Sequence, residues 1–412
     1  MRHTQNELVI KSGILTRRGL LSAAALACSV LVGLSACERK EAPGASGNAA
    51  GSAQAAGDEW VIGHYGSLTG AQATFGRSTD NGIKLAVEEA NKAGGVTFGG
   101  VKKKIRLVSD DTESKAEKAG AVVTKLITKD KVICLLGEVA SKVSLAGADV
   151  AQPMGVPMIT PSSTNPDVTK KGDMIFRVCF IDPFQGQVCA KFAREDLKVA
   201  NAAVLFDQAG AYSVGLKDEF VANFKKMGGK IVSEQAYNEG DSDFNAQLTR
   251  IREAKPELLF IPGYYTDVAN IARQARKLGM TMPLLGGDGW DSEDLAKNGG
   301  EAVEGAYYSN HYAPDQPSPE IEEFVTKYKS AFGSVPDGLA ALGYDAAKIL
   351  FDAMERSPNP TRKDLRDAIA ATKNQKCVTG TISLNDDRDA VKSAVIVQMK
   401  GGKPVFRASI AP

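Results

Sequence analysis

The chain has 412 residues, of which 43% are hydrophobic and 24% are charged, and its formal net charge is +1. This composition is ordinary for a soluble globular protein, and the length predicts two or three folded units. The balanced charge argues against a protein that binds nucleic acid. The chain has three histidines and no cysteine–histidine spacing typical of zinc sites, so we expect neither a metal nor a cofactor.

The first 37 residues have the order of an export signal. Arg17-Arg18 precedes an apolar segment, 19–33, that is too short to span a bilayer comfortably. The tetrapeptide LSAC that closes it resembles a bacterial lipobox, which implies that Cys37 is lipidated and becomes the first mature residue. The paired arginines fit a twin-arginine signal or an ordinary basic n-region, and both alternatives stay open. Residues 38–58, rich in alanine, glycine and serine, should form a flexible linker.

Strands and helices alternate along the rest of the chain, which predicts parallel sheets with helices on both faces. In the first half, the expected strands are 60–65, 105–109, 132–136 and 156–160. The expected helices there are 79–93 and 114–129, the second from a capping box at Ser114–Glu117. In the second half, the expected strands are 202–206, 230–235, 258–261, 283–285, 380–384, 394–399 and 404–406. The expected helices there begin at Asp182-Pro183 and cover 214–227, 319–332, 338–356 and 361–371.

Two successive strand ends are followed by small hydroxyl residues. The strand 132–136 ends at Gly137 and leads through Ser141 into a helix, and the strand 156–160 is followed by the turn Pro161–Thr164. Open α/β sheets bind ligands at such strand ends. Free N–H groups and the helix dipole there favour an anion such as a carboxylate. The alternative is that these hydroxyl groups only cap helices.

The turn ITPSSTNPDVT, at 159–169, resembles the signature of bacterial branched-chain amino-acid binding proteins, the extracytoplasmic receptors of amino-acid and amide ABC importers. The stretches GYYTDVANIARQARKLG, GGDGWDS and LAALGYDAAKILFDAM match further family segments in the family's order. The resemblance spans roughly residues 60 to 407. It implies an α/β fold of the type I periplasmic binding protein class, in which two doubly wound parallel-sheet lobes are joined by a three-crossing hinge around a cleft.

The resemblance also implies the domain boundaries. After the signal peptide, 1–37, and the linker, 38–58, the first ligand-binding lobe comprises 59–181 plus 309–385. The second ligand-binding lobe comprises 182–308 plus 386–412.

By match to the family motifs, four residues should surround the α-carboxylate of the ligand: Ala140, Ser141, Ser163 and Thr164. Asp288 stands where the family places an acid against the α-ammonium, which needs a partner charge once it leaves water. Tyr212 and Tyr264 match positions that supply a hydroxyl or a ring, and Phe75 matches an aromatic at the cleft mouth. Many relatives carry an aromatic where this chain has Leu339, so the side-chain pocket should be larger or differently shaped here.

Excluding Cys28 and Cys37, four cysteines remain: Cys134, Cys179, Cys189 and Cys377. Relatives with a disulfide in the first lobe have a cysteine at the position of Ala140, so that bridge cannot form in this chain. Cys134 should be a buried thiol, since it lies within a strand. A Cys179–Cys189 bridge is the less favoured alternative to two free thiols.

We therefore predict a monomeric extracytoplasmic lipoprotein, periplasmic or on the cell surface, that binds an aliphatic L-amino acid and delivers it to the permease subunits of an ABC importer. Binding of an amide, urea or an aromatic acid is the alternative, although Asp288 favours a ligand with an ammonium group. A ligand sensor for a membrane signalling partner is a second alternative. An enzyme is disfavoured, because the chain has no G-x-S-x-G elbow and no P-loop.

Overall fold

Two open sheets organise the part of the chain that this computed structural model describes, residues 57–412. The predicted signal peptide, the lipidation site Cys37 and all but the end of the predicted linker lie outside the described residues. Within 57–412, no helix combines the length and the apolar character that crossing a membrane requires.

The first sheet has six strands in the order β2-β3-β1-β4-β5-β6. Its strands are β1 (Glu59–Gly66), β2 (Val96–Phe98), β3 (Val101–Asp111), β4 (Leu135–Leu136), β5 (Met158–Thr160) and β6 (Ile175–Arg177). All neighbours pair in parallel except β2 and β3, which form a hairpin at the edge. The carboxyl ends of β1, β4 and β5 therefore meet at one edge of the sheet, where the two hydroxyl-rich turns follow.

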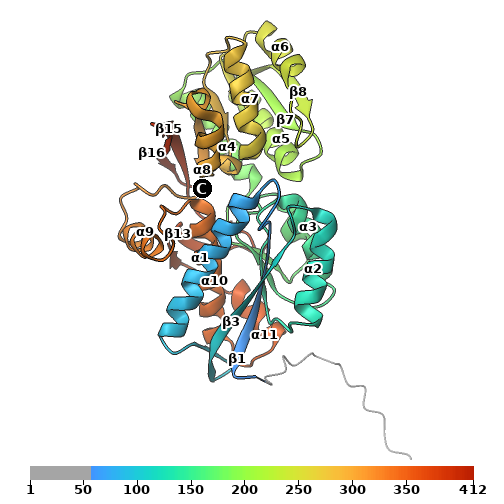
Figure 1. Ribbon diagram of the computed structural model, residues 1–412, viewed down its shortest axis with the longest axis vertical. Helices are drawn as coiled ribbons and strands as arrows, with labels where there is room; N and C mark the ends of the chain where they lie inside the picture. The colour runs from blue at the N-terminus through green and yellow to red at the C-terminus, as the bar shows by residue number, and fades with distance from the viewer. Residues whose placement is uncertain (1–56) are drawn as a thin grey trace, which may run out of the picture. The chain divides into compact units, whose positions relative to one another are not determined.

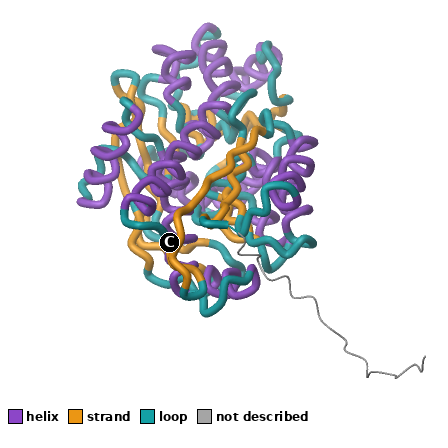
Figure 2. Tube along the Cα trace, turned by 60° about the horizontal axis from the view of Figure 1, so that its bottom comes forward, coloured by secondary structure: helices purple, strands orange, loops and turns teal. Residues whose placement is uncertain are grey.

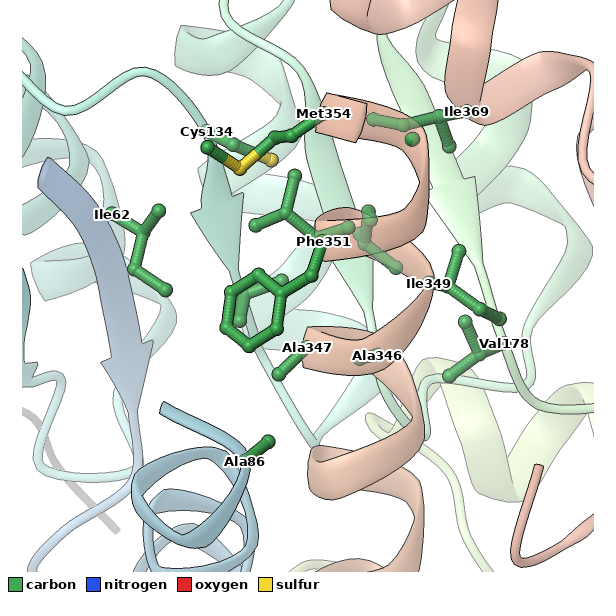
Figure 3. Close-up of a cluster of buried hydrophobic side chains, with 14 of the residues drawn as sticks. Ile62, Ala86, Cys134, Val178, Ala346, Ala347, Ile349, Phe351, Met354 and Ile369 are labelled. Atoms are coloured by element: carbon green, nitrogen blue, oxygen red, sulfur yellow. The ribbon is translucent and has the colours of Figure 1, made fainter. Parts of the chain in front are cut away.

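Helices cover both faces of this sheet (Figure 1). They are α1 (Ala73–Lys92), α2 (Ala116–Thr128), α3 (Ser141–Ala151), α10 (Gly338–Arg356) and α11 (Arg362–Ala370). Figure 3 shows the core on one face, where Ile62 of β1 lies opposite Phe351 and Met354 of α10. The preceding residue of β1, Val61, packs on the other face against the core under α2 and α3.

Helices α1 and α10 pack closely although they are far apart in the sequence (Figure 1). Two glycines allow the approach. A Cβ atom on Gly82 would lie 2.0 Å from the carbonyl oxygen of Ala340, and one on Gly343 would lie 2.4 Å from that of Thr79. Any larger side chain at these two glycines would force the helices apart.

The second sheet has seven strands in the order β16-β15-β11-β10-β9-β7-β8. Its strands are β7 (Asn201–Asp207), β8 (Lys230–Tyr237), β9 (Leu258–Phe260), β10 (Leu284–Gly286), β11 (Tyr307–Asn310), β15 (Ala394–Lys400) and β16 (Lys403–Ile410). The helices on its faces are α4 (Asp182–Lys191), α5 (Ala211–Lys226), α6 (Asn245–Glu253), α7 (Tyr265–Lys277) and α8 (Glu293–Gly299). Figure 2 shows the strands between their helices, and β15 and β16 form the antiparallel edge where the chain ends.

The chain passes between the two sheets three times: after β6, after β11 and before β15. Between the second and third passages lie α9 (Pro319–Phe332), α10, α11 and a small sheet of β12 (Gln375–Cys377), β13 (Gly380–Leu384) and β14 (Ala390–Val391). The predicted alternation and the three-crossing arrangement of two lobes are thus present.

Two local predictions were wrong. Helix α1 begins at Ala73, six residues before the predicted 79, because tertiary contacts hold its first turn: Thr74 N–H donates to the Tyr265 hydroxyl at 3.3 Å. The predicted capping box at Ser114 does not form, and Lys115 precedes α2 instead. Ser114 has a left-handed φ of 59°, and its hydroxyl donates to the Thr69 carbonyl at 2.8 Å. The hairpin strand β2 was not predicted.

Candidate functional site

A small cavity lies between the two lobes and has about 240 Å³ of empty space. Its lining residues are Phe75, Val139, Ser141, Ser162, Tyr212, Tyr264, Asp288, Gly289 and Leu339. They come from α1, α10 and the loops after β4 and β5 of the first lobe, and from α5, the start of α7 and the turn after β10 of the second. This space includes some that is open to solvent, so the cavity is identified by its lining from both lobes rather than by its volume.

The structure brings six of the predicted site residues together around this cavity: Phe75, Ser141, Tyr212, Tyr264, Asp288 and Leu339. The other three, Ala140, Ser163 and Thr164, lie directly behind the lining. The Ala140 N–H already donates to the Glu138 carboxyl at 2.7 Å. The Ser163 hydroxyl donates to the Glu138 carbonyl at 3.0 Å and lies 2.7 Å from the Ser144 hydroxyl. The Thr164 hydroxyl is buried, without a hydrogen-bond partner among the described residues.

Ser141 lines the cavity and does not cap its helix, and its hydroxyl accepts from the Asn165 N–H at 3.4 Å. The residue that precedes α3 is Ala140, which has no side chain that could cap. Ser141 is the first residue of α3, so its hydroxyl and the N–H groups of the first turn lie at the positive end of the helix dipole. With Ser162 from the next loop, this end of the cavity offers hydrogen-bond donors.

Glu138 holds the two loops of this end together, and sequence reasoning missed it. Its carboxyl is fully buried and accepts from the Ser67 hydroxyl at 2.5 Å, the Thr112 hydroxyl at 3.3 Å and the Ala140 N–H at 2.7 Å. Burial raises the pKa of Glu138 to about 7, although these hydrogen bonds oppose the shift. Its carbonyl accepts from Ser163 and from the Thr160 hydroxyl at 2.6 Å.

Asp288 stands at the opposite end of the cavity and is only 7% exposed. It begins the short 3-10 turn Asp288–Trp290 after β10. One carboxylate oxygen accepts from Gln185 Nε2 at 2.8 Å, and the other lies 3.0 Å from His311 Nε2. Burial lowers the pKa of His311 to about 4, so the ring is neutral near pH 7. Asp288 consequently has no cationic partner within residues 57–412.

Aromatic rings form the wall between these two ends. Tyr212 and Tyr264 stack with ring centroids 5.2 Å apart, and the edge of Phe75 meets Tyr264 at 6.0 Å. The Tyr212 hydroxyl accepts from the Gly289 N–H at 3.1 Å, next to Asp288. Leu339 closes the apolar side at the start of α10. The cavity is therefore polar at two ends and apolar between them.

Asp182 is a further buried acid beside the cleft that the sequence analysis did not single out. Neither of its carboxyl oxygens has a hydrogen-bond partner among the described residues. Burial raises the pKa of Asp182 to about 8, the nearby Thr164 hydroxyl opposes this rise and the charge of Asp288 adds to it, so the carboxyl is mostly protonated at neutral pH.

The lining residues that sequence reasoning missed are Val139, Ser162 and Gly289. Each is the chain neighbour of a predicted residue, so the motifs located the right loops and left out these three positions. For His311 a signal existed, since it is one of only two histidines after residue 57.

The four cysteines Cys134, Cys179, Cys189 and Cys377 are all free and buried. Cys189 Sγ lies 3.4 Å from the Ser309 hydroxyl, and Cys179 Sγ lies 3.4 Å from the Ser163 carbonyl. The Cys179–Cys189 bridge, the less favoured alternative, is therefore absent from the structure. No group of histidine, cysteine and acidic side chains in 57–412 could hold a metal ion.

Comparison with known proteins identifies the family. Residues 59–403 match the model of the periplasmic binding protein family. An amino acid binding protein of Pseudomonas aeruginosa is 32% identical over 293 residues, which are 70% of this chain and 76% of that protein.

Two solved structures share the fold. The leucine binding protein LivK of Thermotoga maritima is 40% identical with a TM-score of 0.82, and the match covers 86% of this chain and 99% of that one. A solute binding protein of an R. palustris ABC transporter, in complex with benzoate, is 25% identical with a TM-score of 0.77, covering 86% and 97%. The resemblance seen in the sequence and the predicted type I fold are confirmed. The chain belongs to the periplasmic binding protein family, and proteins named for binding amino acids are among its relatives.

Proposed function

We propose that this protein binds an aliphatic L-amino acid, with leucine, isoleucine or valine first to test, in the cavity between its lobes. The family consists of solute-binding proteins rather than enzymes. The observation that carries the proposal is Asp288, a buried carboxylate that lines a small cavity and has no cationic partner among the described residues. An ammonium group removed from water needs such a partner.

The opposite end of the cavity suits the α-carboxylate of the same ligand. The Ser141 and Ser162 hydroxyl groups and the first turn of α3 supply donors, as an anion requires. In the proposal, Ala140 and Ser163 shape these loops from behind, and Thr164 supplies a further hydroxyl group. Phe75, Tyr212, Tyr264 and Leu339 enclose the aliphatic side chain.

The physiological role that we propose follows from the family. Residues of both lobes line the cavity, so a bound ligand favours the closed arrangement of the lobes, and the closed protein delivers the ligand to an ABC permease. Lipidation at Cys37, a monomeric state, and the lobe boundaries given above complete the proposal. A lipid anchor and a flexible linker would hold the protein near that permease.

An aromatic acid is the second candidate, because the chain is similar to a protein solved in complex with benzoate. The donors around Ser141 would serve that carboxylate equally well, and the aromatic wall would stack on its ring. Benzoate, however, has no cation for Asp288. Burying benzoate in this cavity would leave the Asp288 carboxylate without a partner charge.

Calorimetry of the wild type and Asp288→Asn with leucine and with benzoate tests the proposal. Asparagine keeps the shape and removes the charge, so leucine affinity should fall by roughly 30-fold to several thousand-fold, about 2–5 kcal/mol. Benzoate supplies the control, because its binding needs no charge at position 288. Tight benzoate binding that is indifferent to Asp288→Asn, with no leucine binding, would replace the amino acid by the aromatic acid.

A further inference from the structure

Hydrogen bonds from Gln185 and His311 hold the Asp288 carboxylate. Gln185 Nε2 donates one hydrogen to Asp288 at 2.8 Å and the other to the Ser309 hydroxyl at 3.0 Å. His311 Nε2 lies 3.0 Å from the second carboxylate oxygen. Ser309 and His311 are two positions apart at the end of β11. Gln185 and Asp288 are therefore both hydrogen-bonded to this one segment. Neither carboxylate oxygen can rotate away without breaking one of these bonds.

The partners come from the segments by which the chain passes between the lobes. Gln185 lies in the first turn of α4, directly after the first passage, and His311 lies directly after β11, in the second. The His311 ring also stacks on Phe180 of the first passage, with centroids 3.8 Å apart and an angle of 24° between the planes. The orientation of Asp288 is thus fixed by the hinge.

Both donors are uncharged, and this decides what Asp288 can do. A lysine or arginine in their place would neutralise the carboxylate, whereas an amide and a neutral imidazole orient it and leave its charge available. The charged groups that face the His311 ring are Asp288 and Lys392. A carboxylate can only accept, so the neutral ring carries its proton on Nε2. Nδ1 then has no partner among the described residues, and the residue lines a separate cavity at the hinge.

We infer that Gln185 and His311 are positioning residues for ligand binding, which hold the Asp288 carboxylate as an oriented, uncompensated anion and link it to the hinge. The inference rests on the proposed function in one respect, namely that the ligand carries an ammonium group. It adds two residues to the binding machinery that do not touch the ligand.

Leucine calorimetry on Gln185→Leu and His311→Leu tests the inference. Each variant removes one hydrogen bond to a charged group, so affinity should fall on the order of 10-fold. The matched control is Gln398→Leu, because Gln398 Nε2 also donates a hydrogen bond, to the Tyr307 hydroxyl at 2.8 Å, away from the cavity. His311→Gln places an amide donor near Nε2 and should recover most of the affinity lost in His311→Leu.

The pH dependence of leucine affinity gives a second test, because a residue that only stabilised the fold would not change it. Below about pH 5, His311 begins to take up a proton in the wild type, and the imidazolium then competes with the ligand for Asp288. Leucine affinity should therefore fall more steeply between about pH 5 and 4 in the wild type than in His311→Gln.

The wild-type protein offers a test that needs no variant to fold. Nitrogen NMR of the histidine rings should show the Nε2–H tautomer for His311. His64, whose Nδ1 lies 3.0 Å from the Leu136 carbonyl, should show the opposite tautomer. An Nδ1–H tautomer at His311 would overturn the inference.

Failure of the inference and of the proposed function are distinguishable. If Asp288→Asn leaves leucine affinity unchanged, the ammonium contact and the proposed function fail together. If Asp288→Asn abolishes binding while Gln185→Leu and His311→Leu behave like Gln398→Leu, only the positioning role is wrong.

Discussion

The two ends of the cavity are built in opposite ways. At the end lined by Ser141, the hydrogen bonds of Glu138 and Ser163 join neighbouring loops at one edge of the first sheet to one another. At the end lined by Asp288, the hydrogen bonds of Gln185 and His311, which come from separate segments, converge on the Asp288 carboxylate. The first end is a framework that stabilises the fold, and the second leaves one buried carboxylate without a cationic partner among the described residues.

The largest expected difference between the two ends is in the free energy of unfolding without ligand. Glu138→Ala removes the acceptor of three donors and leaves a small void, so near pH 4.5 the free energy of unfolding without ligand should fall by about 2–4 kcal/mol. Asp288→Asn should change it by less than about 1 kcal/mol. Urea denaturation of both variants measures the difference. Equal midpoints for Glu138→Ala and the wild type would show that the first end is no framework.

The second prediction concerns the pH dependence of that framework. Burial raises the pKa of folded Glu138 to about 7, above its unfolded value, so the native state holds this proton more tightly. The stability from this group is fully present below about pH 4.5 and is lost as the pH rises toward 7. Glu138→Gln mimics the protonated acid. The wild type should therefore lose about 1–3 kcal/mol relative to Glu138→Gln between pH 4.5 and 7.5.

Unfolding curves of both proteins at several pH values measure that loss. Two profiles that run parallel over this range would mean that Glu138 has an ordinary pKa in the folded protein.

The smallest expected effect distinguishes two serines of the same end. Ser163→Ala breaks hydrogen bonds between loops, so it should cost about 1 kcal/mol of stability. Ser141→Ala removes a hydroxyl that lines the cavity, so it should cost affinity for leucine, about 10-fold, rather than stability. Denaturation measures the stability of both variants, and calorimetry measures their affinity for leucine. If Ser163→Ala instead costs more affinity than Ser141→Ala, the lining assigned to this end is wrong.

Elements with strong local signals were predictable from the sequence. Helices α9 and α10 have the predicted bounds, because Ser318 and Asp337 cap their first turns and Gly333 ends α9 in a left-handed conformation. Ser114 had the same kind of signal and failed, because a contact with the Thr69 carbonyl in another loop held its hydroxyl. Local patterns predict helices only where no tertiary contact competes for the capping group.

The site residues show the same difference between local sequence signals and tertiary contacts. Ser141 and Asp288 were identifiable because they lie in short motifs at strand ends, where the family places its ligand contacts. Gln185 and Asp288 are separated by 103 positions in the chain, and no pattern in either segment indicates that they meet. Glu138 was missed because an acid beside a predicted carboxylate site looks unfavourable until its burial and its three donors are known.

The close packing of α1 on α10 bears on how the ligand preference of such a protein can change over evolution. Phe75 lies in the first turn of α1 and Leu339 in the first turn of α10, and Gly82 and Gly343 lock the two helices against backbone atoms. The helices cannot slide to absorb a larger or smaller side chain at the cavity. In the proposed binding site, a single replacement at Leu339 therefore changes the space left for the ligand, so one substitution there can shift the preference without altering the fold or either polar end.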